Sequence, residues 1–112
     1  MRTFETGATR DDTQRKHDYD GFLSPLVLES YAAYMDFKRI QPDGKLRDGD
    51  NWQLGIPLVS YMKSAWRHFM LWWKIHRGYG NKNELEEALC ALIFNASGYL
   101  HELLKEEYNN ES

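Results

Sequence analysis

Two pairs of residues in the second half of the chain have the types and spacing to act on a charged small molecule. Glu84 and Glu87 lie one helical turn apart, the spacing that two carboxylates need to hold one divalent cation from a single helix. Arg67 and His68 come from the middle of an aromatic-rich segment. The structural alternatives are that acids in a first helical turn complement the helix dipole, and that a basic helix face is simply solvated.

The segment that positions Arg67 and His68 is predicted to be a helix over residues 57–77. Pro57 suits the first helical position and Gly78 suits the left-handed residue that ends a helix. His68 falls beside Ser64, at a seam between two faces. On a wheel of about 100° per residue, the apolar face comprises Leu58, Tyr61, Met62, Ala65, Phe69, Trp72 and Trp73, and the basic face comprises Lys63, Arg67, Lys74 and Arg77.

A preceding helix is predicted over residues 24–40, with Ser24 as its N-cap and Pro25 in its first turn. Glu29 and Asp36 share one side with two alanines, which either leaves room for a ligand to approach or is a solvated acidic side. The apolar face comprises Val27, Leu28, Tyr31, Tyr34 and Met35.

A third helix is predicted over residues 83–106, where Asn83 and Glu86 have the spacing of a capping box. The polar tail from Glu102 onward is expected to fray. Small residues beside the core indicate close approach by another helix or a ligand. The expected core stripe is Leu85, Leu89, Leu92, Ala96, Tyr99, Leu100 and Leu103, and the line beside it is Glu84, Glu87, Ala88, Ala91, Asn95, Gly98 and Glu102.

The remaining segments are predicted to be irregular. Residues 1–21 are charged and turn-rich, and residues 41–55 form a loop with two Gly-containing turns. Trp52 in that loop either anchors it to the core or walls a pocket, with Asn51 and Gln53 supplying amide contacts.

The three predicted helices and the chain length of 112 residues lead us to expect one soluble all-α domain over residues 1–112. The 14 Lys and Arg residues against 17 Asp and Glu residues give a net charge of −3, which disfavours nucleic acid and anionic membranes as partners. The single cysteine excludes an intrachain disulfide and favours the cytoplasm, and we find no signal peptide or membrane-spanning run. An aromatic content of 14% indicates a subunit interface or a ring-stacking site.

Taken in order, five motifs resemble small phage proteins of the dATP/dGTP diphosphohydrolase N-terminal domain family. The resemblance spans Gly7 to about Leu104, and the order of the motifs carries it. They are Gly7-Ala-Thr-Arg-Asp11, Lys16-His-Asp-Tyr19, Asn51-Trp-Gln-Leu-Gly-Ile-Pro57, Ser64-Ala-Trp-Arg-His68 and Glu86-Glu-Ala-Leu-Cys-Ala-Leu-Ile-Phe-Asn-Ala96.

The resemblance implies an all-α fold related to MazG-like nucleotide pyrophosphohydrolases. Such enzymes use Mg²⁺ or Mn²⁺ held by helix carboxylates to cleave a nucleoside triphosphate into monophosphate and pyrophosphate. The implied substrate is a purine deoxynucleoside triphosphate of a phage nucleotide pool, in the host cytoplasm. The implied roles are metal ligation by Glu29, Glu84 and Glu87, catalysis by Glu87 and His68, phosphate contact by Arg67 and Lys63, and base or ligand contact by Asn51, Trp52 and Asn95.

The chain departs from the MazG-like pattern at its first acidic pair. After Glu29 it has Ala32 and Ala33, so Asp36, Asp11 or Asp18 is needed to complete a metal cluster. Three hypotheses therefore stand: the metal-dependent hydrolase, a non-catalytic phage protein that binds a nucleotide or a host protein, and a helical interaction module. In each case we expect a homo-oligomer, because three helices with this aromatic load expose apolar surface as a monomer.

Overall fold

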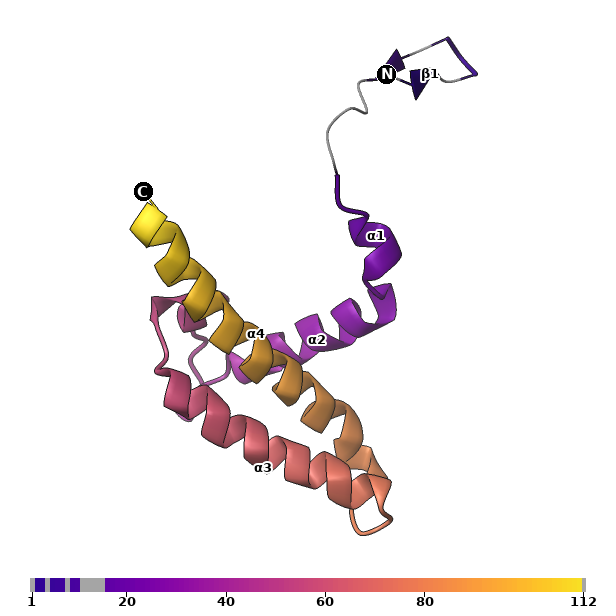
Figure 1. Cartoon of the computed structure of the whole chain (residues 1–112). Helices are drawn as coiled ribbons and strands as arrows, with labels where there is room; N and C mark the ends of the chain where they lie inside the picture. Colours follow the sequence, from indigo (N-terminus) through magenta and orange to yellow (C-terminus); the bar gives the residue numbers. More distant parts are fainter. Residues whose placement is uncertain (1, 4, 8, 11–15, 112) are drawn as a thin grey trace.

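The structure is a computed structural model that describes residues 2–3, 5–7, 9–10 and 16–111. It confirms the all-α class with three main helices, α2 (Pro25–Lys38), α3 (Leu58–His76) and α4 (Leu85–Glu111), as Figure 1 shows. The short helix α1 (Tyr19–Phe22) and two single-turn 3₁₀ helices, η1 (Asn51–Leu54) and η2 (Lys82–Glu84), connect them. Strands β1 (Arg2–Thr3) and β2 (Thr9–Arg10) pair antiparallel. No helix in the described part of the chain has the length and apolar character needed to cross a bilayer.

The structure confirms the sequence signals predicted at the start of α2 and the end of α3, and it differs from the prediction at the start of α4. The Ser24 hydroxyl accepts a hydrogen bond from the Val27 amide at 3.3 Å, which confirms the N-cap of α2. Gly78 follows α3 with a φ of 89°, a conformation that glycine adopts without strain. Ahead of α4, the side chain that caps is that of Asn81, which accepts from the Asn83 amide at 2.9 Å. The capping box predicted at Asn83 is therefore wrong.

Helices α3 and α4 form an antiparallel hairpin that carries the core. The buried residues of α4 are Ala88, Cys90, Ala91, Asn95 and Gly98, so the line of small residues faces α3. A Cβ atom on Gly98 would come within 2.3 Å of the Tyr61 ring. The leucine stripe predicted as the core of α4 is wrong, because small residues allow the helices to approach closely along a different line.

The inward side of α3 also differs from the prediction. Tyr61 and Ile75 are buried, and the predicted seam residues Ser64 and His68 are half-buried beside them. By contrast, most of the predicted apolar face is exposed to solvent. The exposed members of that face are Met62, Phe69, Trp72 and Trp73.

Helix α2 packs against α4, which it crosses in Figure 1. The Ser30 hydroxyl donates a hydrogen bond to the Glu86 carboxylate at 2.6 Å and lies 3.5 Å from the Cys90 sulfur. At the other end of α2, the Lys38 ammonium lies 3.3 Å from the Glu87 carboxylate. These contacts leave a space between α2, α3 and the connecting loop.

Two predicted irregular stretches are helical. Helix α4 continues to Glu111 rather than fraying from Glu102, because no proline interrupts it and Lys105 pairs with Glu102 at 3.1 Å. Helix α1 lies partly within the predicted irregular segment 1–21, and the Asp18 carboxylate caps it by accepting from the Gly21 amide at 3.0 Å. The candidate ligand Asp11 lies outside the described residues.

Candidate functional site

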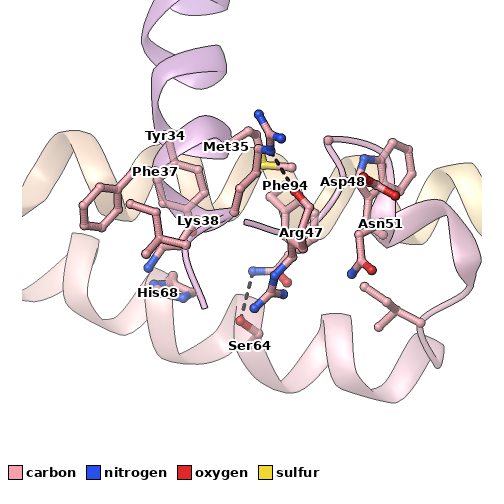
Figure 2. Close-up of a pocket in the computed structure, with 16 residues that line it drawn as sticks. Tyr34, Met35, Phe37, Lys38, Arg47, Asp48, Asn51, Ser64, His68 and Phe94 are labelled. Atoms are coloured by element: carbon pink, nitrogen blue, oxygen red, sulfur yellow. Dashed lines mark hydrogen bonds between the residues drawn. The ribbon is translucent and has the colours of Figure 1, made fainter. Parts of the chain in front are cut away.

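A pocket of about 610 Å³ opens between α2, the loop over residues 39–56, α3 and α4. Figure 2 shows side chains from all four segments turned toward it. Aromatic rings form part of its wall, and three Lys or Arg residues, one histidine, two Asn residues, a serine and one acid supply its polar groups. The lining residues are Tyr34, Met35, Phe37, Lys38, Arg39, Ile40, Arg47, Asp48, Gly49, Asn51, Trp52, Ile56, Ser64, His68, Phe94 and Asn95.

A tight turn after α2 brings Arg39 and Arg47 to the same side of this pocket. Ile40 and Leu46 form an antiparallel bridge around Gly44, which has a φ of 82°. The Arg47 amide donates to the Arg39 carbonyl at 2.9 Å, and the Arg39 Nε donates back to the Arg47 carbonyl at 2.8 Å. This reciprocal pairing fixes the position at which the Arg47 side chain leaves the backbone.

The two arginines differ in what they are free to bind. The Arg39 guanidinium also pairs with the Asp36 carboxylate at 3.3 Å, so its donors are largely used within the protein. The Arg47 guanidinium forms no hydrogen bond or ion pair to any of the described residues, and in Figure 2 the side chain extends into the pocket. Its donors are available to an anion. Sequence reasoning missed Arg47, although the predicted turn at Pro42-Asp-Gly44 between two arginines was the signal that could have found it.

Trp52 both anchors the loop and lines the pocket, so both readings of this residue apply. The indole ring meets the His101 ring edge to face, with ring centroids 4.7 Å apart and planes at 74°. This contact places η1 on α4 and turns Asn51 and Trp52 toward the cavity. His101, interpreted from the sequence as a surface residue, is half-buried under the loop.

Asn95 lines the pocket and connects α4 to α3. Its side-chain nitrogen donates to the Ser64 hydroxyl at 3.1 Å and to the Ala91 carbonyl at 2.9 Å, and the residue is 4% exposed. The carboxamide oxygen accepts no hydrogen bond from the described residues. Asn95 therefore links α4 to α3 through its nitrogen and leaves its oxygen for a molecule in the pocket.

His68 sits in an environment that favours neutral imidazole. Burial lowers the pKa of His68, the Arg67 and Lys38 charges lower it further, and the Glu87 carboxylate acts in the opposite direction. A neutral ring can accept a proton when an anion enters. Lys38 and Glu87, which form an ion pair at the rim of the pocket, thus act in opposite directions on the pKa of His68.

The structure brings four of the predicted site residues together and leaves five outside the pocket wall. Asn51, Trp52, His68 and Asn95 line the cavity. Glu87 reaches the rim only through its ion pair with Lys38. The other predicted site residues are exposed and do not line the pocket: Glu29, Lys63, Arg67 and Glu84.

The predicted metal ligands are not gathered into one donor set. In the described part of the chain, no group of three or more His, Cys, Asp or Glu side chains is arranged to hold a metal ion. Glu87 is paired with Lys38, and the neighbouring Glu86 accepts a hydrogen bond from Ser30. The residues present do not fit an all-protein carboxylate cage, whereas Mg²⁺ in nucleotide sites is commonly held by one or two carboxylates together with the substrate phosphates.

Comparison of the chain with family models, curated proteins and solved structures gave no match.

Proposed function

We propose that the pocket binds a nucleoside phosphate, with a purine deoxynucleoside triphosphate as the expected ligand. The observation that carries this proposal is the Arg47 guanidinium, which has no partner among the described residues, in a cavity whose walls also hold Lys38, His68 and aromatic rings. A cavity of about 610 Å³ lies within the usual range for small-molecule sites, about 300 to 1,000 Å³.

The cationic side of the pocket suits the phosphates. The chain as a whole carries a net charge of −3, yet its pocket is lined by Lys38, Arg39 and Arg47 against a single acid, Asp48. Lys38 and Arg39 are paired with Glu87 and Asp36, so Arg47 is the lining cation that has no partner among the described residues. Arg47 offers a planar pair of donors for phosphate oxygens, and His68 can gain a proton next to the added negative charge.

Other residues that line the pocket suit a base. Trp52 and Phe94 supply aromatic surface, and the Asn51 side chain and the Asn95 oxygen supply hydrogen-bonding groups at the same wall. Aromatic rings stack on any base, whereas amide groups distinguish one base edge from another. The presence of anion-binding and ring-binding groups in one cavity supports a nucleotide over a simple phosphate.

The direct test is calorimetric titration with dATP and dGTP in the presence and absence of Mn²⁺. We expect saturable binding of both nucleotides and much weaker binding of the corresponding nucleosides, which lack the phosphates. A protein that binds neither nucleotide would refute the proposal. Equal affinity for nucleoside and nucleotide would show that the Lys and Arg residues of the pocket do not bind the phosphates.

A second candidate function is metal-dependent hydrolysis of the same nucleotide to monophosphate and pyrophosphate. The observation that favours it is the position of Glu87, whose carboxylate lies 3.3 Å from Lys38 at the rim and influences His68. One carboxylate together with the nucleotide phosphates would hold Mg²⁺ or Mn²⁺ there. Lys38 and His68 would meet the anion on the side of the pocket where Glu87 lies.

Glu87→Gln tests the hydrolytic proposal. We expect pyrophosphate release in Mn²⁺ to fall at least about 100-fold, the range for loss of a group that stabilises the transition state, while nucleotide binding is retained. Glu84→Gln is the matched control, since Glu84 is exposed and lies off the pocket wall. If the unmodified protein binds the nucleotide but releases no pyrophosphate, the hydrolytic proposal is refuted and the binding proposal is retained.

A further inference from the structure

The face of the α3–α4 hairpin that points away from α2 is apolar and uncovered. Its α3 side chains are large and exposed: Met62 by 50%, Trp66 by 62%, Phe69 by 42% and Trp73 by 51%. They recur every three or four residues, as in a helix that packs against another helix. From α4, the half-buried Leu92 and the exposed Ala96 join them. We call these six residues the hairpin face.

Helix geometry places both halves of this face on the side opposite the pocket. On α3, Ser64 and His68 point into the pocket, and the four exposed side chains lie about 100° to 160° around the helix from His68. On α4, Cys90 points toward Ser30 of α2, and Leu92 and Ala96 lie about 120° to 160° around from it. Because the two helices run antiparallel, these rotations bring both stripes to the same side.

The exposed area is larger than a stable monomer of this size presents. The chain exposes 9636 Å², whereas a compact protein of 13.3 kDa exposes roughly 6,400 Å². Part of the difference belongs to the segment ahead of α1, where residues 5–7 and 16–18 are exposed. The rest includes the hairpin face together with exposed apolar side chains of α1, α2 and η1, such as Phe22, Leu26 and Leu54.

We infer that the hairpin face binds a second copy of this chain, so that two α3–α4 hairpins form a four-helix bundle with each pocket on the outside. Four antiparallel helices with apolar inner stripes are a stable packing unit, and a two-fold pair buries the same patch on both partners. The inference does not depend on what the pocket binds.

Charge decides which helix of the partner lies on α3. Helix α3 contains three Lys or Arg residues and no acid, while α4 contains six glutamates and a single lysine. Stacking α3 on the α3 of the partner would place cations beside cations. Stacking α3 on the α4 of the partner, about an axis parallel to the helices, places a basic helix beside an acidic one.

The mass of the protein in solution tests the inference. Sedimentation velocity and light scattering should give twice the 13.3 kDa mass of the chain. Trp66→Glu should give a monomer, because it places a charge in the centre of the apolar face while the side chain, 62% exposed in one chain, is not needed for its fold. Leu54→Glu is the control: Leu54 is 86% exposed on η1, away from the hairpin face, and its variant should stay dimeric.

Circular dichroism separates loss of association from loss of folding. Trp66→Glu should keep its helix content, and Met62→Glu should reproduce the monomer if Trp66→Glu does not fold. A monomeric unmodified protein at micromolar concentration would overturn the inference. So would a dimer that both variants leave intact, or a protein that associates only with lipid vesicles.

Disulfide trapping tests the arrangement of the helices. Met62 and Ala96 lie at the same level of the hairpin, since the neighbouring Tyr61 meets Gly98 and Ser64 bonds Asn95. In a background with Cys90→Ala, copies carrying Met62→Cys should join copies carrying Ala96→Cys when the two are mixed and oxidised. Trapping of Met62→Cys only with itself would show α3 against α3 and contradict the charge argument.

Discussion

The chemistry of the pocket depends on which of its charged side chains are already paired with other groups of the protein. Arg39 is held by Asp36 and by the backbone of Arg47, and Lys38 shares its charge with Glu87. Arg47 has no partner among the described residues, so an incoming anion meets it without first breaking an internal contact. An anion site of this kind requires little rearrangement, which favours affinity.

His68 should make phosphate binding depend on pH. Because the folded protein lowers the pKa of His68, the ring is neutral at pH 7, and a bound phosphate would favour its protonated form. Binding would then take up a proton, and affinity should rise as the pH falls toward the lowered pKa of His68 in the free protein, by up to about tenfold per pH unit. Titration calorimetry in buffers of different ionisation enthalpy measures this proton uptake.

The nucleotide also titrates in this range, so His68→Gln is the control. The variant should lose the part of the pH dependence that belongs to the protein. An unchanged proton uptake would show that His68 does not contact the phosphate.

The stability of the folded protein should depend on pH for the same reason. A histidine with a lowered pKa binds fewer protons when folded, so its contribution is complete above about pH 6.5 and is lost as the pH falls below that value.

At the scale of elements, the site depends on the close approach of α3 and α4. Gly98 lets the Tyr61 ring lie against the backbone of α4, and Asn95 bonds Ser64 a turn away. The other aromatic side chains of α3 are exposed: Trp66, Phe69, Trp72 and Trp73. The pocket floor is thus set by small residues on one helix and polar residues on the other.

Gly98→Ala should destabilise the protein although alanine favours helices. The added methyl group would come within 2.3 Å of the buried Tyr61 ring, an overlap that requires the helices to separate. Overpacking costs about 1 to 3 kcal/mol and outweighs the gain in helix propensity of up to about 1 kcal/mol. Chemical denaturation measures the change. Ser97→Ala, on an exposed neighbouring position, should leave stability nearly unchanged; a Gly98→Ala protein as stable as this control would show that the hairpin is loosely packed.

Across the whole molecule, local sequence signals predicted where helices begin and end better than they predicted which helix faces are buried. The N-cap at Ser24 and the stop at Gly78 depend on neighbouring residues, so the sequence was sufficient for them. The inward faces of α3 and α4 depend on which helices meet, and hydrophobicity identified the two apolar stripes without identifying what covers them. On our account, a second chain covers them.

The candidate site was predictable to a similar extent. Asn51, Trp52, His68 and Asn95 were found because polar or aromatic residues in unusual local settings are visible in sequence. Arg47 was not, because it lines the same pocket as His68 only after the turn folds back on α2. The role expected of Arg67 came from the family resemblance, whereas in the structure Arg67 does not line the cavity.

The most direct test of the account compares Arg47→Ala with Arg67→Ala by calorimetric titration with dATP and dGTP. Both changes remove one arginine from the same protein, but only Arg47 lines the pocket. We predict that Arg47→Ala weakens binding by about 1.5 to 3 kcal/mol, or about 10- to 150-fold, as expected for loss of a charge-assisted contact to phosphate. Arg67→Ala should weaken binding by less than about threefold, since it acts only at a distance. Equal losses in the two variants, or a larger loss from Arg67→Ala, would contradict the assignment of this pocket as the nucleotide site.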